Sequence, residues 1–270
     1  MENHIKEKIN KLGVPLNKWN VQINYGIKTG YNEAFIINGL KRDELIKKSP
    51  TSKNIIRPIL RGRDIQKYKA NWQDLYIIET FPTLKLDIEQ FPAIKEHLLS
   101  FGIDRLKQTG DPGARKKTNN KWFETQDSIS YRDDFFKQKI IWKRIGSVIR
   151  FSYDESGLFC LDSTCFATGS DMKFLVGYLN STVSRRELLR NAPQTGTGDV
   201  ITSVQALEPL LIPKVSEEVR YEVSQLVDLY LTAISNNLVD EAKDVDRRID
   251  QLFFQLFNFS PEEINYISSS

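Results

Sequence analysis

The chain has 270 residues, of which 40% are apolar and 27% are charged. This is ordinary for a soluble protein and leaves room for two domains. No apolar run approaches the roughly 18 residues of a membrane span, and the polar start MENHIKEKINKLG lacks the apolar core of a signal peptide. These features argue against membrane and secreted proteins.

The net charge of +3 conceals an asymmetry between the two halves. Residues 1–150 hold 29 Lys and Arg against 17 Asp and Glu, whereas residues 151–270 hold 9 against 18. A basic half joined to an acidic half favours a polyanionic partner for the first half. Two solvated faces of opposite sign, packed on each other, are the alternative.

Short strands and turns are predicted for the first part of the chain. After a short helix, the alternating segments 20–26 and 33–39 read as strands on either side of a turn. Gly26 and Gly30 permit a tight bend, so we predict a hairpin-like turn. The patterns that follow predict a basic helix over 40–49, a glycine-centred turn at 61–63, a buried strand over 75–80 and a helix over 91–102.

A long polar segment separates these elements from a second group of strands. Residues 107–125 are rich in Gly, Asn and positive charge, which predicts an exposed loop. Cys160 and Cys165 lie in the strand-like context that follows, and we expect buried free thiols in a reducing cytoplasm. A helix over 171–181 and a second glycine loop over 191–203 complete this part.

The character of the chain changes near residue 215. Apolar residues recur at helical spacing over 216–237 and 238–259, and Ser260, Pro261 and Glu263 form a helix-start signature. The fold class we expect is α+β, a mixed or antiparallel sheet with peripheral helices and a C-terminal helical hairpin or bundle. We divide the chain into an α/β domain over 1–214 and an acidic helical scaffold or docking segment over 215–270.

Common catalytic patterns are missing from the sequence. His4 and His97, the only histidines, lie in charged helical surroundings, and GIKTG over 26–30 is too short for a nucleotide-binding phosphate loop. The E-x-K pattern over 241–243 reads as an exposed helix face, and no Asn/Asp-Pro-Pro-aromatic loop occurs. We expect no catalytic residue, no metal ligand and no cofactor in this chain, and leave open whether it is an enzyme with an unrecognised site.

Four predicted loops carry side chains suited to DNA. Arg and Lys neutralise phosphates, and Arg, Lys, Asn and Gln hydrogen-bond base edges. For any single residue a solvated loop is the simpler interpretation, but the set is concentrated in a chain without catalytic groups. The candidate DNA-binding residues are Lys28, Thr29, Tyr31 and Asn32 on the first turn, Arg61 and Arg63 on the second, Arg115, Lys116, Lys117 and Lys121 on the long loop, and Gln194, Thr195 and Thr197 on the late glycine loop.

Specific roles are expected on the first turn. Lys28 is expected to contact a phosphate. Tyr31 or Asn32 is expected either to contact a sugar or a base edge, or to stabilise the turn.

The order of the segments resembles a known family. The pieces that carry the resemblance are G-I-x-T-G-x-N-x-A-F, I-x-R-P-x-L-R-G-R-D-I-x-x-Y and W-F-E-x-Q-D, followed by FATGSDMKFLVGYLNS and ITSVQALEPLLIPK. Over roughly residues 20–268 the chain is similar to the specificity domain of TaqI-type adenine-specific DNA methyltransferases. It is similar also to the specificity region of the fused type IIG restriction–modification enzymes.

The resemblance implies sequence-specific recognition of double-stranded DNA, with residues 1–214 as the α/β DNA target-recognition domain. It also implies a catalytic domain, in the parent chain or as a separate subunit, that binds S-adenosylmethionine and methylates adenine. The chain would then be a fragment or a stand-alone specificity subunit, with endonuclease activity of the parent left open. The alternative from another class is a protein-interaction scaffold acting through the acidic C-terminal helices.

Overall fold

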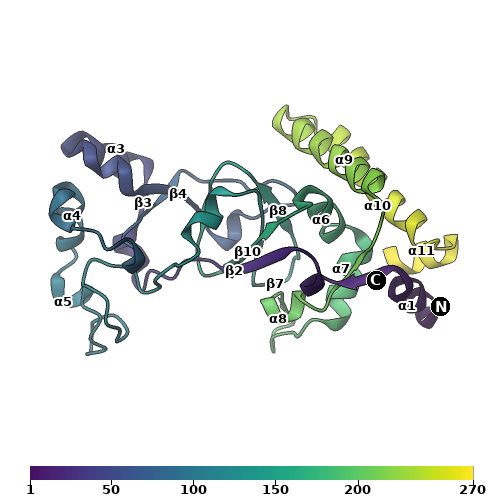
Figure 1. The fold of residues 1–270 in the computed structure, drawn as a ribbon, viewed down its shortest axis with the longest axis horizontal. Helices are drawn as coiled ribbons and strands as arrows, with labels where there is room; N and C mark the ends of the chain where they lie inside the picture. Colours follow the sequence, from purple (N-terminus) through teal and green to yellow (C-terminus); the bar gives the residue numbers. More distant parts are fainter. Residues whose placement is uncertain (270) are drawn as a thin grey trace.

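The computed structural model describes residues 1–269. Strands occupy the middle of an elongated molecule, with helices at both ends (Figure 1). The helices are α1 (Glu2–Leu12), α2 (Asn32–Phe35), α3 (Gly39–Lys48), α4 (Pro92–Leu99), α5 (Ile103–Leu106), α6 (Met172–Leu179), α7 (Thr182–Asn191), α8 (Val204–Leu207), α9 (Glu217–Ser235), α10 (Val239–Leu256) and α11 (Pro261–Ser268). The strands are β1 (Gly13–Pro15), β2 (Val21–Tyr25), β3 (Ile36–Asn38), β4 (Ile56–Leu60), β5 (Leu75–Ile78), β6 (Lys139–Lys143), β7 (Ile145–Gly146), β8 (Phe151–Asp154), β9 (Phe159–Cys160), β10 (Thr164–Gly169), β11 (Val200–Ile201) and β12 (Leu211–Pro213).

Two four-stranded sheets form the centre. One has the order β2-β10-β6-β8 and is antiparallel throughout. The other has the order β3-β5-β4-β9, in which only the β4–β9 pair is parallel. Two short antiparallel ladders, β1 with β12 and β7 with β11, bring later segments back to earlier ones. This α+β architecture agrees with the fold class expected from the sequence.

The hairpin predicted around Gly26 and Gly30 is wrong. Strand β2 pairs with β10 and β3 pairs with β5, so the segment between them crosses from one sheet to the other. Residues 32–35 form helix α2 instead of extending the predicted strand. Gly26 is required by close packing, because a Cβ atom there would lie 2.0 Å from the carbonyl oxygen of Leu161.

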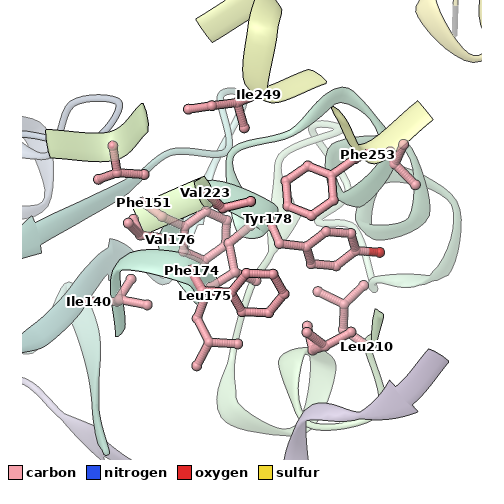
Figure 2. Close-up of a cluster of buried hydrophobic side chains, with 14 of the residues drawn as sticks. Ile140, Phe151, Phe174, Leu175, Val176, Tyr178, Leu210, Val223, Ile249 and Phe253 are labelled. Atoms are coloured by element: carbon pink, nitrogen blue, oxygen red, sulfur yellow. The ribbon is translucent and has the colours of Figure 1, made fainter. Parts of the chain in front are cut away.

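The largest hydrophobic core joins the first sheet to the C-terminal helices. Figure 2 shows Phe174 and Tyr178 of α6 packed among side chains that come from β8, α9 and α10. Helices α6 and α9 approach closely, since a Cβ atom on Gly177 would lie 2.6 Å from Val223 Cγ1. The helices after residue 214 therefore share one core with the sheet. The boundary placed at residue 214 from the sequence coincides with a change in amino-acid composition.

Local signals at the C-terminal end are confirmed. Helix α9 ends at Ser235 and α10 begins at Val239, with Asn237 in the left-handed conformation at φ 59°. Ser260 and Glu263 form the capping box that starts α11. Residues 236–238 are thus the turn of a helical hairpin.

The two cysteines are buried free thiols, as predicted. Burial raises the pKa of each thiol to about 12, so both stay protonated at neutral pH. Among the described residues, no helix is long and apolar enough to cross a bilayer.

Candidate nucleic-acid interface

The first predicted turn is held together by its own side chains. Thr29 is buried, and its Oγ1 donates to Asn32 Oδ1 at 2.6 Å and accepts from the Tyr31 amide at 3.1 Å. The Tyr31 hydroxyl donates to Glu33, and the Arg105 guanidinium lies 4.2 Å from the centre of the Tyr31 ring. Thr29 and Asn32 therefore shape the turn.

Lys28 is the exposed cation of this turn. Its backbone amide donates to Asp127 Oδ2 at 3.2 Å, and its side chain has no ion-pair partner among the described residues. Burial raises the pKa of Asp127, although the charges of Lys28 and Lys116 oppose that shift. Lys28 of the first turn and Lys116 of the long loop thus both act on the Asp127 carboxylate.

Arg115 corrects the prediction that residues 107–125 are exposed throughout. Its side chain is 2% exposed, and its guanidinium donates to the carbonyl oxygens of Leu106, Thr29 and Trp122 at 2.7–2.9 Å. Burial lowers the pKa of Arg115 to about 10, which leaves it protonated at neutral pH. All three guanidinium nitrogens of Arg115 donate to backbone carbonyl oxygens. The side chain therefore does not face solvent, and it stabilises the conformation of the loop.

The neighbouring cations of the long loop remain at the surface. Lys116, Lys117 and Lys121 are exposed, and Lys121 Nζ lies 5.5 Å from the centre of the Phe123 ring. Gly110, in the left-handed region at φ 79°, permits the tight turn in which its amide bonds the Arg115 carbonyl. The buried Arg115 thus presents Lys116 and Lys117 to solvent.

The two arginines of the second turn differ in their surroundings. Arg61 is largely buried and forms two hydrogen bonds to Asp64, Nε to Oδ2 at 3.0 Å and Nη2 to Oδ1 at 2.8 Å. Arg63 is exposed and has no ion-pair partner among residues 1–269. Arg61 therefore stabilises the turn, and Arg63 is available to a ligand.

The late glycine loop is attached to the first sheet through β7. Val200 of β11 pairs with Gly146, and the Thr202 hydroxyl donates to the carbonyl oxygen of Lys143 at 2.7 Å. At the tip of the loop, Thr195 and Thr197 hydroxyls lie 2.9 Å apart. The Thr195 hydroxyl also accepts from the Asp199 amide, while the Gln194 side chain is exposed. The threonines thus order the loop, while the exposed Gln194 amide makes only a long hydrogen bond to the Leu189 carbonyl, at 3.5 Å.

Three cations that the sequence analysis did not single out lie between these loops. Arg144 stands 5.0 Å from the centre of the Tyr25 ring and donates to the Asp162 carbonyl at 3.0 Å. Lys143 and Arg150, on either side of β7, are exposed. The signal was present as the pair Lys-Arg directly after the apolar run of β6, but we interpreted that segment only as a strand.

The exposed loops carry groups suited to binding. The loop after α5 and the segment around α8 both project toward the lower side of the molecule in Figure 1, on either side of the first sheet. Within residues 1–269, no three His, Cys, Asp or Glu side chains are grouped to hold a metal ion. The exposed cations and amides on these loops are suited to a polyanion.

Comparisons with known proteins agree with this architecture. The type II methyltransferase M.MjaIV of Methanocaldococcus jannaschii is 25% identical over 249 residues, which cover 88% of this chain and 79% of that protein. The solved structure of the type IIL restriction–modification enzyme MmeI in complex with DNA is similar with a TM-score of 0.61 at 14% identity. That match covers 94% of this chain and 35% of the enzyme.

A second solved structure has the same fold over nearly all of the chain. The type IIG restriction endonuclease BpuSI is similar with a TM-score of 0.55 at 14% identity, covering 94% of this chain and 32% of the enzyme. The chain thus spans about a third of the length of each solved enzyme. A family model, the TaqI-like C-terminal specificity domain, matches residues 57–209, more than half of the sequence. The chain therefore belongs to the family of TaqI-like C-terminal specificity domains.

Proposed function

We propose that this chain recognises a specific sequence in double-stranded DNA, as the specificity component of a restriction–modification adenine methyltransferase. Separate cationic and polar loops are joined to one another around the first sheet, and this observation carries the proposal. Arg115 ties the long loop to the first turn, and β7 with β11 attaches the late glycine loop. Family membership supports the same function.

The exposed loop residues offer two kinds of contact to DNA, one to phosphates and one to base edges. Lys28, Arg63, Lys116, Lys117 and Lys121 are exposed cations suited to phosphates, which position a protein on DNA without reading its sequence. Gln194 carries an amide that can bond a base edge. Thr29, Arg61 and Arg115 act through the shape of the loops, because their polar groups are engaged inside the protein.

Catalysis would be carried out by a different domain. A methyltransferase domain, in the parent chain or in a separate subunit, would bind S-adenosylmethionine and methylate adenine in the cytoplasm. We assign no residue of this chain to that cofactor.

Fluorescence anisotropy with the chain and a duplex of random sequence tests the proposal. We expect binding that weakens with salt at a slope of about −0.9 per phosphate contact. Repeated selection from the random pool should then enrich one sequence. If the chain binds no duplex at low salt, alone or with a TaqI-type methyltransferase domain added, the proposed function is wrong.

A protein-interaction scaffold is the second candidate, and one surface favours it. Leu229, Leu238 and Val239 are exposed near the turn of the α9–α10 hairpin. A hollow of about 520 Å³ there is also lined by Asp240, Glu241 and Asp244. An apolar patch with an acidic rim suits a basic amphipathic segment. Under this alternative, charge reversal at Glu241 and Asp244 would abolish a protein contact and leave DNA affinity unchanged.

A further inference from the structure

A small cationic pocket lies beside the second turn. It has a volume of about 150 Å³, and its lining includes Arg63, Lys143 and Arg150 together with Val148. The residues come from the turn after β4, the end of β6 and the segment before β8. Three positive side chains from separate segments thus meet at one place.

The pocket lacks a negative charge of its own. Arg63, Lys143 and Arg150 have no ion-pair partner among the described residues, and Arg150 donates only to the neutral amide of Gln66, at 2.6 Å. In contrast, the adjacent Arg61 is neutralised by Asp64, and Lys95 by Glu89. Like charges that converge without a counter-charge repel one another, so an anion that joins them is stabilised.

Gly62 leaves room in this pocket because it has no side chain. A Cβ atom at residue 62 would lie 3.0 Å from Ser163 Oγ and 3.1 Å from Lys143 Cγ. The absence of a side chain there lets Lys143 lie against the turn that carries Arg63. Val148 is 54% exposed at the rim, so apolar surface stands beside the charges.

A larger hollow shares one wall residue with this pocket. Arg150 also lines a hollow of about 530 Å³ that contains Lys67 and Lys69 and ends at Tyr230 and Ile234 of α9. Lys67 is paired with Asp246, whereas Lys69 donates to the hydroxyl of Ser235 and keeps its charge uncompensated. The two hollows share Arg150 in their walls, and their linings together extend from Gly62 to Tyr230 and Ile234 of α9; we refer to the two hollows together as the basic groove.

We propose that this groove binds the sugar–phosphate backbone of the duplex, as a contact that extends from Arg63 of the second turn toward α9. The inference rests on the proposed function and adds the path that one strand follows toward the C-terminal helices. The long cationic side chains suit phosphates, which carry no sequence information directly. Gln194 forms an isolated bridge with Val200, and Val200 pairs with Gly146 shortly after Lys143 in the chain, so backbone and base contacts can be made together.

Paired charge removal tests the groove. The variant Lys143→Gln with Arg150→Gln keeps two polar side chains but removes both charges. We expect affinity for every duplex to fall roughly tenfold or more at physiological salt, and the salt slope to decrease by about 2. The sequence preference should be unchanged. The matched control is Lys6→Gln with Lys11→Gln, since both lysines are exposed on α1 and the variant has the same net charge.

The outcomes separate the groove from the general function. If the unmodified chain binds DNA and both double variants bind equally well, the assignment of the groove to the DNA backbone is wrong, while the proposed function stands. If no protein binds DNA, even with a methyltransferase domain, both fail. An unchanged slope with an altered sequence preference would assign Lys143 and Arg150 to base contact and overturn the backbone assignment.

Chemical protection gives a second readout that does not depend on a variant. An amine-acylating reagent applied to the unmodified chain, followed by mass spectrometry, measures the reactivity of each lysine with and without bound duplex. We expect DNA to protect Lys143 and Lys69 several-fold and to leave Lys6 reactive. Equal reactivity of Lys143 in the free and bound protein would overturn the proposal.

Discussion

Arg115 Nη1 donates a hydrogen bond to the carbonyl oxygen of Thr29 at 2.9 Å, so the long loop is fixed to the first turn by a single buried cation. The two residues lie 86 positions apart in the sequence. Arg115 also closes its own loop through the Leu106 and Trp122 carbonyls. Two segments that sequence reasoning treated as separate DNA contacts are therefore one structural unit.

Replacing Arg115 with alanine should destabilise the protein. The change leaves the Leu106 and Trp122 carbonyls without their donor, while the Thr29 carbonyl keeps its bond from the Gln126 amide; each lost bond to a buried group costs about 1–3 kcal/mol. We expect a decrease of roughly 3 kcal/mol or more in the free energy of unfolding, measured by urea denaturation. Arg115→Lys should recover little of it, because an ammonium group cannot reach the three carbonyls in the guanidinium's planar geometry.

The control for this prediction is the neighbouring pair Lys116→Ala with Lys117→Ala. Both side chains are exposed, so we expect a change in stability within about 0.5 kcal/mol and a loss of DNA affinity. If Arg115→Ala had the stability of the wild type and only weakened DNA binding, the buried role of Arg115 would be contradicted.

Gln194 should affect the choice of sequence more than the strength of binding. An amide that bonds a base edge contributes about 1–3 kcal/mol of discrimination. Gln194→Ala should therefore relax the preference at one position of the selected site by about tenfold, while affinity for random duplex changes little. Competition binding with single-base variants of the site measures this.

Lys117→Ala is the contrasting variant for Gln194. It should weaken binding to all duplexes to a similar degree, since a phosphate contact is independent of sequence. A uniform loss for both variants would remove Gln194 from the base-reading role.

The packing of His97 should make stability depend on pH. Burial lowers the pKa of His97, and its Nε2 lies 3.0 Å from the Ala34 carbonyl oxygen. Because the folded pKa is below the unfolded one, the folded state disfavours the charged imidazole. This contribution to stability is complete above the unfolded pKa of about 6.5 and decreases as the pH falls below it.

Urea unfolding at pH 7.5 and at pH 5 measures the His97 contribution. The wild type should lose more stability on acidification than His97→Gln, which cannot be charged. His4→Gln, on exposed α1, is the control and should behave as the wild type. An equal loss for His97→Gln and the wild type would show that other groups control the acid response.

Asp250 anchors helix α10 to the start of α7. Its Oδ1 accepts from the Thr182 amide at 2.7 Å and its Oδ2 accepts from the Thr182 hydroxyl at 2.6 Å. Asp250→Ala should cost about 1–3 kcal/mol, because the partly buried Thr182 donors lose their partner. Asp250→Asn should cost clearly less, since its amide oxygen can still accept from the backbone. Equal losses for the two variants in thermal denaturation would contradict this assignment.

Local signals in the sequence predicted the C-terminal region well. The Asn236–Asn237 turn and the Ser260 cap depend on residues within a few positions, and both appear in the structure. The hairpin at Gly26 failed because β2 pairs with β10, about 140 residues away, and the segment itself does not specify that partner. The antiparallel pairing of β2 with β10 depends on side-chain packing throughout the core.

The candidate site shows the same division between local and distant information. A glycine-rich basic stretch identified the long loop correctly, but the burial of Arg115 depends on carbonyl groups of Thr29 and Trp122 that only the fold brings close. Conversely, Lys143 and Arg150 belong to strand-like segments, and their convergence with Arg63 is visible only once β4, β6 and β8 are assembled.

The β1–β12 ladder has a consequence for protein engineering. Gly13 lies opposite Pro213 and Pro15 opposite Leu211, so the chain leaves and returns at one point. The residues between β1 and β12 can be regarded as a cassette whose two junctions with the rest of the chain lie side by side. Exchange of this cassette between relatives, with the contacts of α10 to Lys67 and Thr182 retained, would transplant a reading surface without altering the path of the chain on either side.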